Sequence, residues 1–134
     1  MQAYYFSASW CGPCKNFTPM LAEFYAKLRD AGISSELFEI FFVSSDRAAE
    51  DYRVYRATMP WDAVAYADVD RKAELAKAYG VRSIPDLVVV SAADNSRVIS
   101  RSGRGDVVDS LESSATSVYE RWRKVLHEAN YNDI

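Results

Sequence analysis

Two cysteines, Cys11 and Cys14, constrain the fold of this chain more than any other feature, because of the segments on either side of them. Residues 3–7 are aromatic and apolar, and predict a strand that ends just before the cysteines. Pro13 stands between the two cysteines, and proline is favoured in the first turn of a helix. We therefore expect Cys11 at a strand-to-helix junction and Cys14 one turn inside the helix.

This placement predicts redox chemistry. A sulfur at a helix N-terminus faces unpaired backbone N–H groups and the positive end of the helix dipole. These groups stabilise the thiolate, and the pKa of a free thiol, ~8.5, falls to about 7 or below in such settings. Lys15 adds a positive charge that favours the thiolate of Cys11. Cys14 would then attack a mixed disulfide formed at Cys11 and expel the product thiol.

Two alternatives to a redox dithiol are weaker. A zinc site needs two further ligands, and the chain offers one histidine, His127, and no third cysteine, so zinc would have to be shared between chains. A structural disulfide between Cys11 and Cys14 would close a very short loop and would constrain the unfolded chain little.

The remaining periodicity predicts an α/β fold. Arg47 to Ala57 reads as a polar helix with Tyr52 and Tyr55 turned inward, and Asp70 and Gly80 as the cap and the end of another. The predicted order is β-α-β-α-α-β-β-α, which gives a mixed sheet of four to five strands with helices on both faces, in one domain spanning 1–134. The expected elements are strands 3–7, 37–43, 87–91 and 97–101, and helices 13–30 (kinked at Pro19), 47–57, 70–79 and 107–129.

The predicted C-terminal helix, 107–129, is strongly amphipathic. Its apolar residues recur in steps of three and four, and its other face, with Arg121, Arg123 and Lys124, is charged. The residues expected to face the core are Val108, Leu111, Ala115, Val118, Trp122, Val125 and Ala129.

A second element of the predicted site is Pro85, which stands just before the apolar strand 87–91. Proline cannot donate to a sheet, so its position needs an explanation. A cis Ile84–Pro85 bond would turn the chain sharply and free the backbone of Ile84 to pair with an extended substrate beside Cys11. Only about 5% of X–Pro bonds are cis, but the upstream cysteine pair favours cis here.

Composition excludes several classes of protein. The chain has 134 residues, 49% of them hydrophobic, and a net charge of −3. This balance argues against a nucleic-acid partner, and no apolar run is long enough for a membrane span. The first residues lack the pattern of a secretory signal. We therefore expect a cytoplasmic protein, a compartment in which a structural disulfide is rare.

The motifs together resemble the thioredoxin superfamily. The resemblance is carried by Trp10-Cys-Gly-Pro-Cys-Lys15, by Pro19 inside the following helix, and by Ile84-Pro85 before an apolar strand. The sequence around these motifs narrows the resemblance to the tryparedoxin and nucleoredoxin branch, over about residues 3–104. The segments that carry this closer likeness are Tyr5–Cys11, Phe17–Pro19, Glu23–Tyr25, Met59–Trp61 and Gly80–Pro85.

The resemblance implies a thiol–disulfide oxidoreductase with no bound cofactor or metal beyond its own dithiol. Electrons would come from a glutathione-type thiol such as trypanothione, or from a reductase, and pass to disulfide proteins such as peroxiredoxins. Cys11 would be the nucleophile, Cys14 the resolving cysteine and Pro85 the cis-proline. The surface around the thiolate would comprise Trp10, Gly12, Pro13, Trp61 and Ile84. For Trp61, packing in the core is an equal alternative.

The chain departs from the family pattern at four places. Gly12 stands where tryparedoxins have proline, and Asp86 where they tend to have threonine. A carboxylate at Asp86 would raise the pKa of Cys11 and repel acidic substrates, but would attract a polyamine. Tyr5 stands where thioredoxins keep a buried acid. The N-terminus is short, so we expect strand 37–43 at an exposed sheet edge that promotes self-association.

Other polar residues have weaker claims on the site. Arg101 and Arg104 follow the predicted hairpin, and would either bind a glutathionyl carboxylate or be solvated. Asp46 would relay protons or cap the helix at 47. His127 is expected to be exposed.

The rival function is a redox-switched binding module, in the manner of nucleoredoxin, that holds a partner on helix 107–129 with little turnover. Both functions suit one fold, and a fold alone does not decide between them.

Overall fold

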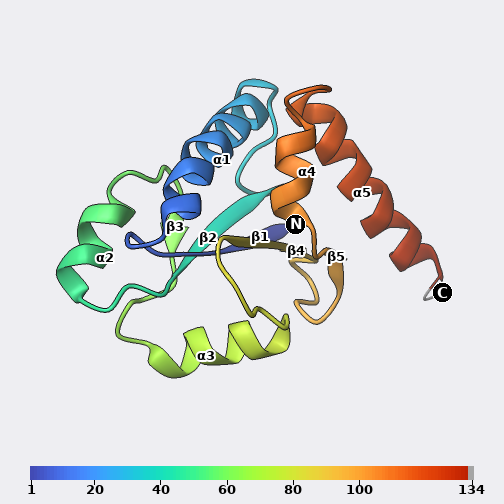
Figure 1. The fold of residues 1–134 in the computed structure, drawn as a ribbon. Helices are drawn as coiled ribbons and strands as arrows, with labels where there is room; N and C mark the ends of the chain where they lie inside the picture. Colours follow the sequence, from blue (N-terminus) through green and yellow to red (C-terminus); the bar gives the residue numbers. More distant parts are fainter. Residues whose placement is uncertain (133–134) are drawn as a thin grey trace.

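The computed structural model describes the backbone of residues 1–132 and the side chains of residues 1–128. Its centre is a five-stranded mixed sheet with the order β3-β2-β1-β4-β5 (Figure 1). β1 pairs parallel with β2 and antiparallel with β4, while β3 joins β2 in parallel and β5 joins β4 antiparallel. The strands are β1 (Gln2–Ser7), β2 (Glu39–Ser44), β3 (Asp62–Ala63), β4 (Asp86–Val90) and β5 (Val98–Ser100).

Both faces of the central strands are buried. Successive side chains of a strand point to opposite faces, so Ala3 and Tyr5 of β1 join one apolar cluster while Tyr4 and Phe6 join the other. The near-continuous apolar sequences of β1, β2 and β4 follow from this arrangement, because most positions along them are buried.

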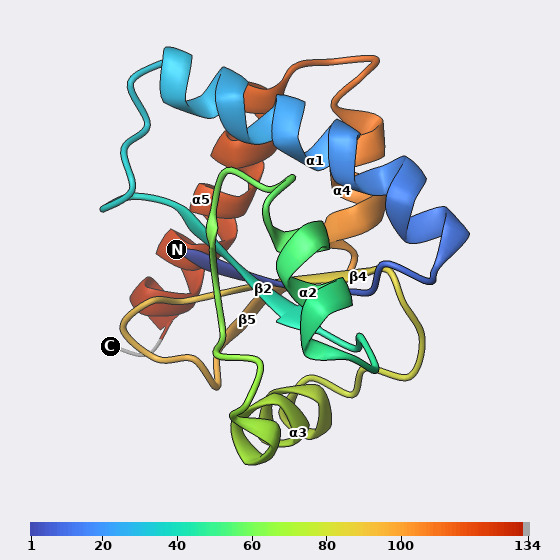
Figure 2. The same cartoon turned by 90° about the vertical axis from the view of Figure 1, so that its left-hand side faces the viewer.

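Helices cover both faces of this sheet, as predicted. Figures 1 and 2 show α1, α4 and α5 on one face and α3 on the other. Tyr55 of α2 belongs to the same apolar cluster as α1 and α5, and Tyr52 packs against it, which confirms the inward direction of both tyrosines. The helices are α1 (Gly12–Asp30), α2 (Ala49–Arg56), α3 (Val69–Ala78), α4 (Gly103–Asp109) and α5 (Ala115–Asn132).

The single helix predicted over 107–129 is wrong, because the chain forms α4 and α5 with a break between them. Serines end one helix and begin the next: the Ser110 hydroxyl donates to the Val107 carbonyl at 2.5 Å, and the Ser117 amide donates to the Ser114 hydroxyl at 3.1 Å. Serine competes with the helical backbone in this way and favours caps. These serines indicate a helix break in the sequence, but the regular apolar spacing favoured one continuous helix.

The break changes which residues of this region are buried. Val107 is buried in place of Val108, while Leu111 and Val125 are exposed, contrary to expectation. Ala115, Val118 and Trp122 face the core as predicted. The predicted inward side chain of Ala129 lies outside the described residues.

The predicted sheet edge is also wrong, because β2 is an interior strand. The short strand β3, absent from the predicted order, pairs with Phe41 and Phe42 of β2. Two residues are too few to show strand periodicity in a sequence. The self-association predicted from an exposed edge therefore loses its physical basis.

Helix ends are set by local chemistry. Asp68, and not Asp70, caps α3 by accepting a hydrogen bond from the Arg71 amide at 3.0 Å. Gly80 ends that helix as predicted, and its φ of 63° is one that glycine adopts without strain. α1 is continuous through Pro19.

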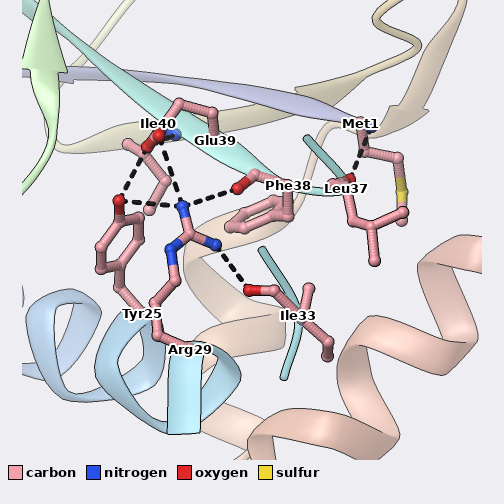
Figure 3. A network of polar contacts seen from close by, with 8 residues as sticks. All are labelled: Met1, Tyr25, Arg29, Ile33, Leu37, Phe38, Glu39 and Ile40. Atoms are coloured by element: carbon pink, nitrogen blue, oxygen red, sulfur yellow. Dashed lines mark hydrogen bonds and ion pairs between the residues drawn. The ribbon is translucent and has the colours of Figure 1, made fainter. Parts of the chain in front are cut away.

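The C-terminal end of α1 is fastened to the start of β2 by Arg29 (Figure 3). Its guanidinium donates to the carbonyls of Ile33 and Phe38, both at 2.8 Å, and pairs with Glu39 at 3.3 Å. The Tyr25 hydroxyl donates to Glu39 at 3.0 Å. Because β2 lies beside β1, this network fixes α1 relative to the strand that leads into the cysteines.

α4 approaches β4 closely at Gly103. A Cβ atom at this position would lie 2.5 Å from the Leu87 carbonyl oxygen and 2.9 Å from the Leu87 side chain, whereas one at Gly105 would meet nothing within 4 Å. Glycine at 103 therefore allows α4 to pack on the sheet.

We predict that Gly103→Ala lowers the free energy of unfolding by about 1–3 kcal/mol, the usual cost of overpacking. Gly105→Ala, in the same helix, is the control and should leave stability unchanged or raise it by up to about 1 kcal/mol. Urea denaturation followed by circular dichroism measures both. Equal stability of the two variants would contradict the close packing.

Candidate redox site

Cys11 and Cys14 lie where the sequence predicted, at the junction of β1 and α1. They form a disulfide with a Cα–Cα distance of 5.2 Å. Cys11 is the N-cap of α1, and its sulfur accepts a hydrogen bond from the Cys14 amide at 3.3 Å. Cys11 is 7% exposed and Cys14 is fully buried. The outer sulfur thus has a backbone donor that would stabilise negative charge on it, and the inner sulfur is shielded from solvent.

The loop before β4 brings Pro85 to the cysteines. The Ile84–Pro85 bond is cis, as predicted. The Cys11 sulfur lies 3.8 Å from the Ile84 carbonyl oxygen, although 73 residues separate the two along the chain. The structure therefore places the cysteine pair, the cis-proline and the backbone of Ile84 together.

Trp10 lies on the surface beside Cys11. It is 51% exposed, and its indole N–H donates to the Ser45 carbonyl at 3.0 Å. The Arg47 guanidinium stacks over its ring at 4.8 Å. Trp10 and Ile84 line one crevice of about 270 Å³, which Ser83 and Arg82 extend. Two of the predicted substrate-binding residues thus share a hollow.

A second crevice lies beside Pro13. It has a volume of about 180 Å³, and Pro13, Met20 and Arg104 are among the residues that line it. Arg101 points elsewhere, and its guanidinium donates to the Tyr79 carbonyl at 2.6 Å. Of the two arginines considered from the sequence, Arg104 lines this crevice and Arg101 does not. Gly12 is exposed, with open space where a side chain would project.

Trp61 belongs to the core. It is 4% exposed and packs edge-to-face on Tyr5 and Tyr25. Trp61 is thus a core residue, as the packing alternative had it. Its side chain is too buried for the substrate-contacting role that the resemblance implied.

Asp46 holds the loop before Cys11 in place. Its carboxylate accepts from the Ser9 amide at 2.8 Å, the Ser9 hydroxyl at 2.6 Å and the Ser44 hydroxyl at 2.7 Å. It does not cap α2, whose N-cap is Ala48 without a side-chain bond. The sequence singled out Asp46 but not its partner Ser9, since residues 37 apart leave no local signal.

A buried cluster of four hydroxyls lies beneath Cys14, which sequence reasoning did not find. It comprises Ser7 and Tyr5 of β1, Thr18 of α1 and Tyr55 of α2, joined by three contacts of 2.7 Å. Burial raises the pKa of Tyr5 well above its ordinary value. Thr18 and Tyr55 also line the floor of a cavity of about 550 Å³ between α1 and α2.

Asp86 begins β4, directly after the cis-proline. Burial raises the pKa of its carboxyl, and this effect is opposed by a hydrogen bond from its neighbour Leu87 and by the charges of Arg101 and Arg104. The departure from the family pattern at this position therefore leaves a half-buried acid close to the site.

His127 is exposed on α5 as predicted, and Arg121 of the charged face pairs with Asp106 at 3.1 Å. Among the described residues, no three metal-ligating side chains gather into a group. No described helix has the length and apolarity that a membrane crossing requires.

Comparison with known proteins agrees with this geometry. A family model described as thioredoxin-like matches residues 1–96. The chain belongs to the thioredoxin-like family. The Cys11–Cys14 disulfide and the cis-proline beside it thus lie in the part of the chain that the thioredoxin-like family model matches.

Within the thioredoxin-like family, this chain lies in the nucleoredoxin and tryparedoxin branch. It is 44% identical to nucleoredoxin of Mus musculus over 105 residues, which are 78% of this chain and 23% of that protein. It is 41% identical to tryparedoxin of Trypanosoma brucei brucei, also over 105 residues, which are 69% of that protein. The chain thus spans about a quarter of the nucleoredoxins it matches.

Solved structures show the same thioredoxin-like fold. A tryparedoxin II complexed with glutathionylspermidine superimposes with a TM-score of 0.74 and 37% identity, over 84% of this chain and 74% of that one. Tryparedoxin from Trypanosoma brucei gives a TM-score of 0.74 with 38% identity. The thioredoxin-like fold predicted from the sequence is confirmed, as is membership of an oxidoreductase family with a cysteine pair.

The raised pKa of Asp86 predicts a pH-dependent stability. The folded protein holds this proton more tightly than the unfolded chain, so it binds more protons between the ordinary pKa of 3.8 and the raised value. Stability from this group is therefore greatest below pH 3.8 and is lost as the pH rises through the raised pKa.

Asp86→Asn removes this titration. We expect the free energy of unfolding of the variant to rise relative to wild type as the pH is raised from about 3.8 to 7. Urea unfolding at a series of pH values measures the difference. A difference that stays constant over this range would show that burial does not govern the charge of Asp86.

Proposed function

We propose that this protein is a cytoplasmic thiol–disulfide oxidoreductase that reduces protein disulfides, with Cys11 as the attacking and Cys14 as the resolving cysteine. One observation carries the proposal: the Cys11 sulfur caps α1 and accepts the Cys14 amide at 3.3 Å. A thiolate at this position is stabilised by the helix N-terminus, and the thiolate is the reactive form of cysteine.

The proposed reaction moves two electrons in two exchanges. In the reduced protein, the Cys11 thiolate attacks a substrate disulfide, forms a mixed disulfide and releases one substrate thiolate. Cys14 then attacks the Cys11 sulfur, which forms the Cys11–Cys14 disulfide and releases the second substrate sulfur. The substrate is reduced to two thiols, and the protein reaches the oxidised form described above.

The substrate chain would lie along the backbone of Ile84. Its carbonyl oxygen is 3.8 Å from the Cys11 sulfur, and Ile84 precedes the cis bond to Pro85 and lies outside β4. The crevice of Trp10 and Ile84 would receive one side of the chain, and the crevice of Pro13 and Arg104 the other. These contacts surround Cys11. Cys14 is fully buried and does not meet the substrate chain.

A glutathione-type thiol is the proposed electron donor. One structural neighbour at 37% identity is a tryparedoxin II complexed with glutathionylspermidine, which supports a donor of this chemical class. Trypanothione belongs to the same class, and a half-buried carboxylate at Asp86 would attract its polyamine. The proposed acceptors are disulfide proteins of the peroxiredoxin kind, and the proposal needs neither nucleic acid nor membrane.

A redox-switched binding module is the second candidate. The identity with nucleoredoxins favours it. The suggested partner surface does not, because the apolar face of α5 is already occupied: Trp122 is 2% exposed and packs on Phe24 and Phe38. A partner would therefore have to bind elsewhere.

We predict that Cys11→Ser abolishes reduction of insulin or of a peroxiredoxin, because the attacking sulfur is lost. Cys14→Ser should react once and stop as a stable mixed disulfide, since the resolving sulfur is missing. Turnover assays and intact-protein mass spectrometry measure the two outcomes, with Ser110→Ala, far along the chain from the cysteines, as the control. Wild-type protein that reduces neither substrate, yet captures a partner in one redox state, would favour the binding module.

A further inference from the structure

The hydroxyl cluster beneath Cys14 is tied to the backbone of the resolving cysteine. Thr18 donates its hydroxyl hydrogen to the Cys14 carbonyl at 2.9 Å. Thr18 also contacts the hydroxyls of Tyr5 and Tyr55, each at 2.7 Å, and Tyr55 contacts Ser7 at 2.7 Å. All four side chains are nine-tenths buried or more. The cluster connects β1, α1 and α2, which Figure 2 shows close together.

The direction of these hydrogen bonds follows from the number of hydrogens. Thr18 has a single hydroxyl hydrogen. While it donates this hydrogen to the Cys14 carbonyl, it accepts from Tyr5 and Tyr55, and the Tyr5 hydroxyl also donates to that carbonyl at 3.4 Å. Tyr55 then has no hydrogen left for Ser7, and Ser7 must donate to Tyr55. Every hydrogen in the cluster therefore points toward the Cys14 carbonyl, and bonds aligned in this way polarise one another.

The cluster is not a proton acceptor. Burial raises the pKa of Tyr5 far above neutrality, so its hydroxyl stays protonated. Among the described side chains, no carboxylate bonds to any of the four hydroxyls. Tyr5, at the position where thioredoxins keep a buried acid, thus belongs to a neutral network of hydroxyls. This network can affect where Cys14 lies, but it cannot take up the proton of Cys14.

We propose that Thr18, held by the hydroxyls of Tyr5 and Tyr55, is a positioning residue that fixes the first turn of α1 so that the Cys14 sulfur can reach the mixed disulfide at Cys11. The proposal rests on the proposed function and assigns a part of the second exchange to this cluster. The bond from Thr18 joins the buried Cys14 carbonyl to β1 through Tyr5 and to α2 through Tyr55.

Without a buried base, the proton of Cys14 leaves with the product. The Cys14 sulfur gives up its proton and attacks the Cys11 sulfur as a thiolate, the Cys14–Cys11 bond forms, and the bond from Cys11 to the substrate sulfur breaks. The departing substrate thiolate takes the proton released from Cys14, so the products are one protein disulfide and one substrate thiol. The step needs no further reactant.

One reagent separates the two exchanges. When reduced protein in excess meets dithiobis(nitrobenzoic acid), attack by Cys11 releases one coloured thiolate and resolution by Cys14 releases the second. Stopped-flow absorbance gives a first phase for attack and a second for resolution. The second must be independent of protein concentration, which excludes attack by another molecule.

We expect Thr18→Val, which removes the hydroxyl but keeps the shape, to slow the second phase roughly tenfold and to leave the first phase unchanged. Thr18→Ser should restore the second phase, because it restores the hydroxyl. Thr58→Val is the matched control: Thr58 lines the same cavity and donates only to the nearby Tyr55 carbonyl, at 2.7 Å. Its two phases should equal those of wild type.

Tyr55→Phe removes one donor to Thr18 and should slow the second phase in the same direction. If circular dichroism shows that Thr18→Val does not fold, Tyr55→Phe alone tests whether the cluster affects resolution. The proposal is overturned if neither variant slows resolution, if Thr18→Ser is as slow as Thr18→Val, or if both phases fall by the same factor. Wild-type protein that releases no second thiolate would instead contradict the proposed function.

Discussion

The hydrogen bond from the Cys14 amide to the Cys11 sulfur is the interaction on which the rest of the site depends. It exists because α1 begins at Cys11, where the first amides of the helix have no partner within the helix. The neighbouring strand and loop hold this sulfur in place. β1 leads the chain into position, and the carboxylate of Asp46 holds the turn at Ser9 by accepting two hydrogen bonds from it.

The sheet explains why distant segments meet at Cys11. β1 lies between β2 and β4, so the end of β1 has the Asp46 loop on one side and the cis Ile84–Pro85 bond on the other. Helices on both faces bury this central strand and make its position rigid. The close packing of α4 at Gly103 and the Arg29 network at the far end of α1 are two fastenings that hold the helices against the sheet.

The buried region beneath the cysteines differs in kind from a site with an acid. A carboxylate there would change its charge during the reaction, whereas the cluster of Ser7, Tyr5, Thr18 and Tyr55 stays neutral and offers directed hydrogen bonds. Charge is found instead at the rim, where Asp86 lies half-buried near Arg101 and Arg104. The interior of this site thus supplies geometry, and its rim supplies the electrostatic contacts available to a partner.

The sequence by itself determined the features that depend on neighbouring residues. The spacing of Cys11 and Cys14 and the start of a helix at Pro13 were readable because helix initiation is local chemistry. The cis-proline was predicted from the place of Pro85 before an apolar strand together with the upstream cysteine pair. The α/β alternation and the two-faced burial of the central strands followed from apolar runs.

Only the tertiary structure decided which distant side chains meet. The two residues of β3 form a strand because β2 lies beside them. Trp61 is buried by packing that its own sequence neighbourhood does not specify. The four hydroxyls come from three elements, with Ser7 and its partner Tyr55 48 residues apart, and such contacts leave no periodic trace in a single sequence.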